Sequence, residues 1–445
     1  MNLFANEIKK TIYLSIPIVV GQIGQLSMSV VDNIMVGKVG VQALAAASIA
    51  NALFTLVMVV GFGISMAITP LTAIALGRGK DMECGVILRQ GLILNLLFGI
   101  VLCGITFGVS ECIRFMDQPI DIVAPSALYM KVLGFSIIPM MIFQSYRQFA
   151  EGVSFLKPAM IITLLANLIN IFVNWVFIYG NLGVPAMGLT GAGFATISSR
   201  IFMAAFLMIV VMKFKSFKQF DPTLNYRKID FSIMKKLLKI GIPSGCQYFF
   251  EVSAFAASSV MIGWIGATEL AAHQIAMNLA SISFMVAMGI SAAATIRVGN
   301  AVGKNDIHAT RTAGFSATIL CAVFMASAGL FFIHFRHILP GFYLSEVKVI
   351  ELASTVLIIA AIFQVSDGTQ AVGLGILRGI TDMKIPTFFT FAAYWLLGLP
   401  SGYILAFKFN LGIMGVWYGL LTSLTVSAFL MIARFHFKSK VFIQV

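Results

Sequence analysis

The stretch Gly241-Ile-Pro-Ser-Gly-Cys-Gln-Tyr-Phe-Phe-Glu-Val-Ser-Ala-Phe-Ala-Ala-Ser-Ser-Val-Met-Ile262 decides the fold class. It is long and apolar enough for a membrane-spanning helix, which needs about 20 residues, yet Glu251 lies near its middle. A charged side chain at this depth costs roughly 2.5–3.5 kcal/mol on insertion scales, so such residues are rare and face a bundle interior. Asp32 and Asp367 lie in other apolar runs. One acid alone fits a structural carboxylate, whereas three together favour a functional site.

The composition indicates a polytopic membrane protein built from helices. The 445 residues are 59% hydrophobic and only 11% charged, with a mean hydropathy of +0.97, whereas soluble chains carry about 25% charged residues. In lipid every backbone polar group must be paired, which leaves helices or a closed barrel, and the long apolar runs favour helices. We predict twelve spans at residues 10–33, 45–70, 86–109, 124–149, 158–180, 188–213, 234–262, 270–296, 310–334, 348–378, 385–407 and 411–434.

The net charge of +13 is a topology signal. With both termini in the cytoplasm, 23 of the 30 Lys and Arg residues fall on the cytoplasmic side, as the positive-inside rule predicts. We therefore expect the lipid bilayer, and no nucleic acid, as the partner of these charges. The five cysteines show neither paired nor metal-ligand spacing, so we expect free thiols.

The chain repeats itself. A shift of 226 positions aligns Ile16–Gly77 with Ile242–Gly303 and gives 20 identities in 62 positions. We predict an amino-terminal six-helix bundle at residues 1–213, a cytoplasmic linker at 214–235 and a carboxy-terminal six-helix bundle at 236–445. Six spans per half make the two repeats parallel, related by an axis along the membrane normal, an architecture suited to alternating access.

Pro17 and Pro243 occupy equivalent positions in the first span of each half. Proline removes a backbone donor and kinks a helix, so each position is either a hinge or a static kink.

Polar side chains form stripes along four predicted spans, two in each half. Residues three, four and seven apart share a helix face. Single stripes also occur as hydrogen-bonding contacts between helices, but four of them suggest a polar pocket inside each bundle. The stripes are Gln22, Gln25, Ser29 and Asp32; Asn167, Asn170 and Asn174; Ser244, Gln247, Tyr248 and Glu251; and Phe363, Gln364, Asp367 and Gln370, with Asn278 and His273 on the eighth span.

Buried carboxylates of this kind can exchange a proton for a cation, because burial favours the protonated form and a bound cation favours the ionised one. Carboxylate and amide oxygens also suit Na⁺. The sequence holds no His-Glu-x-x-His zinc motif and no phosphate-binding Gly-rich loop. We therefore expect a carrier that uses an ion gradient, with no cofactor, and regard a membrane-embedded enzyme as the alternative from another class.

Seven motifs together resemble the multidrug and toxic compound extrusion family, and the Phe-Phe-Glu and Asp367 pattern resembles its NorM branch. The resemblance covers essentially the whole chain. The motifs are Val31-Asp-Asn-Ile-Met-Val-Gly37, Glu151-Gly-Val-Ser-Phe-Leu-Lys-Pro158, Asn170-Ile-Phe-Val-Asn-Trp175, Phe249-Phe-Glu251, Ala271-Ala-His-Gln274, Ile296-Arg-Val-Gly299 and Leu377-Arg-Gly379.

This resemblance implies a monomeric antiporter of the bacterial inner membrane that exports cationic amphipathic compounds in exchange for entering Na⁺ or H⁺. It implies that Asp32, Asn170 and Asn174 form an amino-half site. It also implies that Glu251 and Asp367 bind the coupling cation, which is Na⁺ if the protein is sodium-coupled. Phe363 departs from relatives that can have tyrosine four residues before the aspartate. A flippase for a lipid-linked substrate is the alternative within transport.

Arg200 has no counterpart that we can assign in the family pattern. It lies in the middle of the sixth span, so it either pairs with an internal acid or extends its charge toward an interface.

Overall fold

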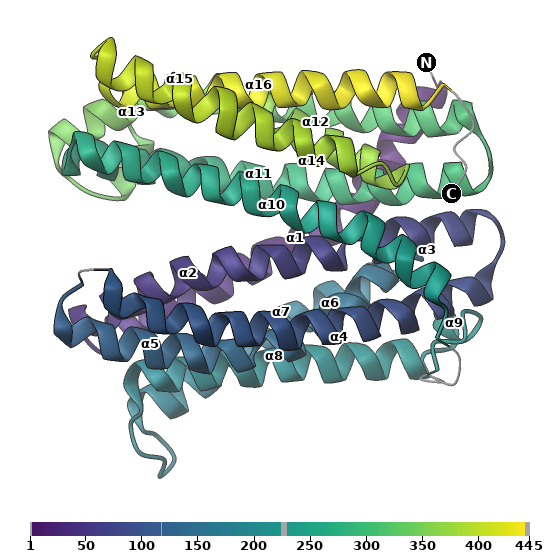
Figure 1. Ribbon diagram of the computed structural model, residues 1–445, viewed down its shortest axis with the longest axis horizontal. Coiled ribbons are helices and arrows are strands. Elements are labelled where there is room, and N and C mark those ends of the chain that lie inside the picture. Colours follow the sequence, from purple (N-terminus) through teal and green to yellow (C-terminus); the bar gives the residue numbers. More distant parts are fainter. Residues whose placement is uncertain (1, 117, 224–228, 441–445) are drawn as a thin grey trace. The chain divides into compact units, whose positions relative to one another are not determined.

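The computed structural model describes residues 2–116, 118–223 and 229–440, which form helices and connecting turns without a β-strand (Figure 1). Residues 224–228 of the predicted linker lie outside the described residues. Within the described part, the helices are α1 (Asn2–Gly37), α2 (Val41–Ser65), α3 (Ile68–Gly77), α4 (Asp81–Cys112), η1 (Ile113–Phe115), α5 (Ile120–Phe135), α6 (Ile137–Gly152), α7 (Lys157–Tyr179), α8 (Gly188–Lys213), α9 (Lys215–Lys218), α10 (Phe231–Ile265), α11 (Ala267–Gly303), α12 (Ile307–Phe335), η2 (Leu339–Phe342), α13 (Val347–Gly379), α14 (Lys384–Phe391), η3 (Ala392–Gly398), α15 (Leu399–Tyr403), η4 (Ile404–Lys408) and α16 (Gly412–Lys438).

Twelve helical segments of the described chain are long and apolar enough to cross a membrane. Each predicted span falls on one of them, so the prediction of an all-α protein with twelve spans is confirmed. Two spans are interrupted, the second between α2 and α3 and the fourth between α5 and α6. In the eleventh span, π-helical turns flank α15, where Pro400 removes a backbone donor from the helix.

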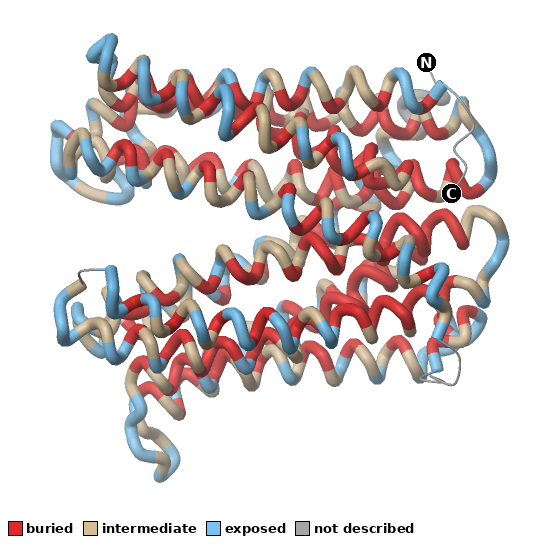
Figure 2. The backbone as a smooth tube through the Cα atoms, viewed as in Figure 1, coloured by how far each residue is buried: buried red, intermediate tan, exposed pale blue. Residues whose placement is uncertain are grey.

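The exposed faces of the spans carry large apolar side chains, such as Leu97, Leu168 and Phe331. Figure 2 shows buried and exposed residues alternating along most helices, whereas α6 is buried over nearly its whole length. Apolar side chains on the outward face are what a helix bundle in lipid requires.

The chain forms two compact units whose borders fall inside α1 and α10. The amino unit is Val20–Gly245, and the carboxyl unit combines Met1–Val19 with Cys246–Val445. Each border lies two or three residues after the internal proline, Pro17 or Pro243. The unit borders therefore differ from the sequence division at residues 213 and 236. The first part of α1 belongs to the carboxyl unit, and the first part of α10 belongs to the amino unit.

Glycines allow these first helix segments to pack closely. In the amino unit, a Cβ on Gly63 would lie 2.5 Å from the Gly245 Cα. In the carboxyl unit, Gly289 packs in the same way against Val19 and lies near the backbone oxygen of Ser15. Positions 63 and 289, like 19 and 245, are equivalent under the 226-residue shift, so both units use one packing scheme.

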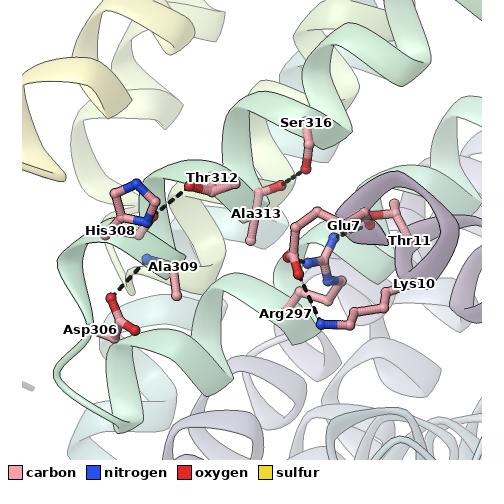
Figure 3. A network of polar contacts seen from close by, with 10 residues as sticks. All are labelled: Glu7, Lys10, Thr11, Arg297, Asp306, His308, Ala309, Thr312, Ala313 and Ser316. Atoms are coloured by element: carbon pink, nitrogen blue, oxygen red, sulfur yellow. Dashed lines mark hydrogen bonds and ion pairs between the residues drawn. The ribbon is translucent and has the colours of Figure 1, made fainter. Parts of the chain in front are cut away.

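Polar contacts also hold the start of α1 in the carboxyl unit. Figure 3 shows Arg297 of α11 beside Glu7 and Thr11 of α1. Arg297 forms an ion pair with the Glu7 carboxylate, a hydrogen bond to Thr11 and a 2.8 Å hydrogen bond to the Glu7 backbone oxygen. Lys10 adds a 2.9 Å contact to Glu7.

Candidate functional site

The amino unit contains a cavity of about 200 Å³ between α1, α2, α5 and α8. Its walls combine polar groups with methionine, phenylalanine and other apolar side chains, as sites for amphipathic molecules do. The lining residues are Gln25, Met28, Ser29, Asp32, Asn51, Phe54, Thr55, Met58, Val59, Phe62, Tyr129, Leu133, Thr196 and Arg200.

Asp32 is the only carboxylate among these lining residues, and neutral donors hold it in place. Asn174 of α7 donates a 2.6 Å hydrogen bond to Asp32 Oδ1, and the Thr196 hydroxyl of α8 lies 3.4 Å from Oδ2. Asn174 also donates to Asn170 Oδ1, one helical turn earlier, at 3.0 Å. The structure thus brings together the three residues that the sequence placed in an amino-half site. Gln25 joins them in the cavity wall, where its Nε2 is buried without a partner in the described chain.

Arg200 faces the same cavity. Its guanidinium donates a 2.6 Å hydrogen bond to the buried Ser136 hydroxyl and lies 5.3 Å from the centre of the Phe54 ring. Sequence reasoning identified Arg200 but not these partners, because Phe54 lies in α2, Ser136 between α5 and α6, and Arg200 in α8, so the three share no local spacing.

The carboxyl unit holds a second group of polar residues around Glu251. Gln247, one turn earlier on α10, donates a 2.5 Å hydrogen bond to Glu251 Oε2. Gln370 of α13 lies 3.4 Å from Oε1, and the Tyr394 hydroxyl donates to Gln370 Oε1 at 3.0 Å. Asp367, also on α13, is buried and close enough to interact electrostatically with Glu251.

Tyr394 is the residue of this group that sequence reasoning missed, since an aromatic residue in an apolar span looks like ordinary core. The ring of Phe363, where relatives can have tyrosine, packs against Phe255 and Trp417 at 6.2 and 5.4 Å between centroids. Tyr394 packs against the same Phe255 ring at 5.9 Å. A phenolic hydroxyl is therefore present beside the acids, but it comes from the eleventh span.

The other predicted residues of the carboxyl half take different positions. Gln364 accepts a hydrogen bond from Ser283 and is buried with it. Tyr248 is half-buried under the guanidinium of Arg378, 5.8 Å from its ring centre. Asn278 is exposed. His273 shares a 2.9 Å hydrogen bond with Ser259 and packs on Trp417, which is a structural environment.

The Glu251 group has a donor set that suits a hard cation, because its oxygens are carboxylates and amides. Gln247 Oε1 is buried without a partner in the described chain, so it is available as a further ligand. Within the described residues, no three His, Cys, Asp or Glu side chains cluster as metal ligands. A sodium ion held here as cargo would need Glu251 and Asp367 together with amide or hydroxyl oxygens.

A sequence model described as MatE matches the chain twice, at residues 17–176 and 243–404. The two matches fall in the two halves of the internal repeat.

Curated relatives match nearly the whole chain. A probable multidrug resistance protein NorM of Mesorhizobium japonicum is 35% identical over 442 residues, covering 97% of this chain and 94% of the relative. The multidrug resistance protein MdtK of Yersinia pseudotuberculosis is 33% identical over 447 residues, covering 99% and 97%.

Solved structures share the fold. The eukaryotic MATE transporter AtDTX14 superposes with a TM-score of 0.89 at 21% identity, covering 98% of each chain. An outward-facing multidrug resistance MATE family transporter of the MOP superfamily also gives 0.89, at 20% identity over 99% of this chain and 97% of the other. With the family match and the full-length relatives, the twelve-helix chain described here belongs to the MatE family.

Proposed function

We propose that this protein is a secondary active multidrug efflux antiporter that exports cationic amphipathic compounds in exchange for entering Na⁺ or H⁺. The observation that carries the proposal is the presence of isolated carboxylates in two separate sites, Asp32 in the amino-unit cavity and Glu251 with Asp367 in the carboxyl unit. The full-length relatives named multidrug resistance proteins support the substrate class.

In this proposal the Glu251 group couples transport to the ion gradient. Two neighbouring buried carboxylates repel each other, so binding of either a sodium ion or a proton stabilises the pair. Gln247 and Gln370 orient Glu251 through their amide groups. Binding of the cation or proton from outside would then favour one state of the transporter, and its release to the inside would favour the other. This difference between the two states is the requirement for coupling.

We further propose that the protein is a monomer in the bacterial inner membrane with both termini in the cytoplasm. The excess of Lys and Arg in the loops on one side supports this orientation. Alternating access would come from movement of the two halves about the first helix of each repeat.

Transport in proteoliposomes tests this function. Ethidium efflux should be driven by a sodium gradient alone or by a proton gradient alone, whichever ion is coupled. Glu251→Gln and Asp367→Asn should each lower gradient-driven efflux at least tenfold, because each removes one of the two buried charges. Direct ethidium binding to the Glu251→Gln protein should stay within about threefold, since Asp32 and its cavity are left intact.

The matched control is Glu351→Gln, which makes the same change at an exposed position of α13 and should leave efflux unchanged. Full gradient-driven efflux by both Glu251→Gln and Asp367→Asn would refute the coupling assignment. Loss of ethidium binding with unchanged cation binding in Glu251→Gln would reverse the division of labour between the two sites.

A further inference from the structure

Arg378, from the Leu377-Arg-Gly379 motif, is a buried charge at the end of α13. It is 5% exposed, and its Nε is buried without a partner in the described chain. No ion pair joins it to a carboxylate among the described residues. Burying a charge that is not paired is costly, so the guanidinium needs a reason beyond the packing of α13.

Arg378 belongs to the surroundings of the Glu251 group. It is close enough to Glu251 to interact with it electrostatically, and its guanidinium lies 5.8 Å from the centre of the Tyr248 ring. Tyr248 lies one turn before Glu251 on α10, so the two share a helix face. Asp367 lies about three turns before Arg378 on α13. The two acids therefore have a positive charge near them that forms no ion pair with either.

Close packing on α11 fixes the place of this charge. The Thr295 hydroxyl donates a 2.8 Å hydrogen bond to the Gly375 backbone oxygen, about one turn before Arg378. A Cβ on Gly379 would lie 2.9 Å from the side chain of Val298. The end of α13 cannot move away from α11 without losing these contacts, so the distance between the guanidinium and the acids is set by the fold.

A positive charge fixed here weakens cation binding by Glu251 and Asp367. Arginine keeps its charge in proteins, so it repels the bound ion and stabilises the ionised acids once the ion has left. A direct ion pair would instead occupy the carboxylate oxygens that the ion needs. At an effective dielectric constant of about 20, a unit charge roughly 10 Å away changes a binding constant on the order of tenfold.

We propose that Arg378 sets the ion affinity of the Glu251–Asp367 pair and keeps it low enough for the coupling ion to leave. The inference rests on the proposed antiport function and deepens it, because each transport cycle requires release of the ion. Arg378 does not hold the ion itself. It acts through Glu251 and is therefore a positioning residue.

Arg378→Gln tests this role by removing the charge. Ethidium efflux from proteoliposomes is measured against external Na⁺ at fixed pH, and against external pH without Na⁺. We expect the half-saturating concentration of the ion that drives efflux to fall about five- to twentyfold. The maximal rate should fall at least about threefold, since the ion leaves more slowly when it binds more tightly. Damage to the structure of the site would raise the half-saturating concentration, so the direction of the change separates the two explanations.

Two further variants serve as controls. Arg378→Lys keeps the charge and should keep the half-saturating ion concentration within about threefold of wild type. Arg336→Gln makes the same substitution as the test variant at the surface of the same unit and should change neither quantity. An unchanged or raised half-saturating concentration in Arg378→Gln would overturn the proposal. A larger change in Arg378→Lys would also overturn it, even where the glutamine variant does not fold, because the charge alone would then not set the affinity.

The wild-type protein separates this proposal from the function on which it rests. Wild-type proteoliposomes that move ethidium under neither ion gradient would count against antiport and, with it, against the role of Arg378. Ion-driven efflux by wild type with the same ion dependence in Arg378→Gln would leave antiport intact and reject only the role of Arg378.

Discussion

At the scale of single residues, Tyr394 contacts the buried acid Glu251 only indirectly, through the side chain of Gln370. Its hydroxyl donates to Gln370 Oε1 at 3.0 Å, and the amide nitrogen of Gln370 lies 3.4 Å from Glu251. Tyr394→Phe leaves the buried Gln370 oxygen without this donor, a change that costs about 1–3 kcal/mol. We expect the half-saturating concentration of the coupling ion to rise about three- to tenfold, measured by efflux against Na⁺ or H⁺ concentration.

The control for that change is Tyr403→Phe, because Tyr403 lies in the same span and is exposed. It should leave the ion dependence unaltered. Equal ion dependence in wild type and Tyr394→Phe would show that the hydroxyl does not act on the Glu251 group.

Residues of the candidate sites were predictable where the membrane makes them conspicuous. Asp32, Glu251 and Asp367 stand out because a charge in an apolar span is costly, and Asn170 and Asn174 stand out through their one-turn spacing. Tyr394, Ser136 and Phe54 carry no such signal: each is an ordinary residue for its span and gains its contact through packing between spans. The roles of these residues in transport stay predictions.

At the scale of helices, the close contact between Gly63 of α2 and Gly245 of α10 predicts the effect of an added methyl group. An added Cβ would lie 2.5 Å from both the Cα and the backbone nitrogen of Gly245, and backbone atoms cannot move aside without separating α2 from α10. We therefore expect Gly63→Ala to destabilise the protein by about 1–3 kcal/mol, the usual cost of overpacking, as a lower thermal unfolding temperature in detergent.

Gly104→Ala is the matched control, because a Cβ at this α4 position meets nothing within 4 Å. Since alanine favours helices over glycine by roughly 1 kcal/mol, this variant should be as stable as wild type or slightly more stable. A Gly63→Ala protein that unfolds at the wild-type temperature would contradict the close packing of α2 on α10.

The helices themselves were predictable because hydropathy and length are local properties, and every predicted span overlaps one of the observed segments. The interruptions near Ser136 and Met66 and the π-helical turns around Pro400 were not predicted. They change backbone hydrogen bonds without changing the apolar character of the span, so hydropathy gives no sign of them.

At the scale of the whole molecule, the repeat in the sequence predicted two related halves but not the exchange of their first helix segments. The 226-residue shift identifies equivalent positions in the two halves, but it does not show which half each position packs against. The exchange depends on close contacts such as Gly63 with Gly245 and Gly289 with Val19, and on the Arg297 contacts to Glu7. Each of these contacts joins a residue of the first half of the sequence to one of the second half, and no local pattern connects them.

Pro17 and Pro243 lie just before the borders of the two units. Because α1 and α10 each pass from one unit to the other shortly after Pro17 or Pro243, a change in either helix is expected to affect movement of the units. Alanine restores the missing backbone donor and stiffens the helix, so Pro17→Ala and Pro243→Ala should each lower the maximal rate of ethidium efflux about tenfold while ethidium affinity stays within twofold. Pro125→Ala changes a proline inside α5, away from both borders, and should keep the wild-type rate. Unchanged efflux rates in both border variants would mean that Pro17 and Pro243 are static kinks and that the units move about other positions.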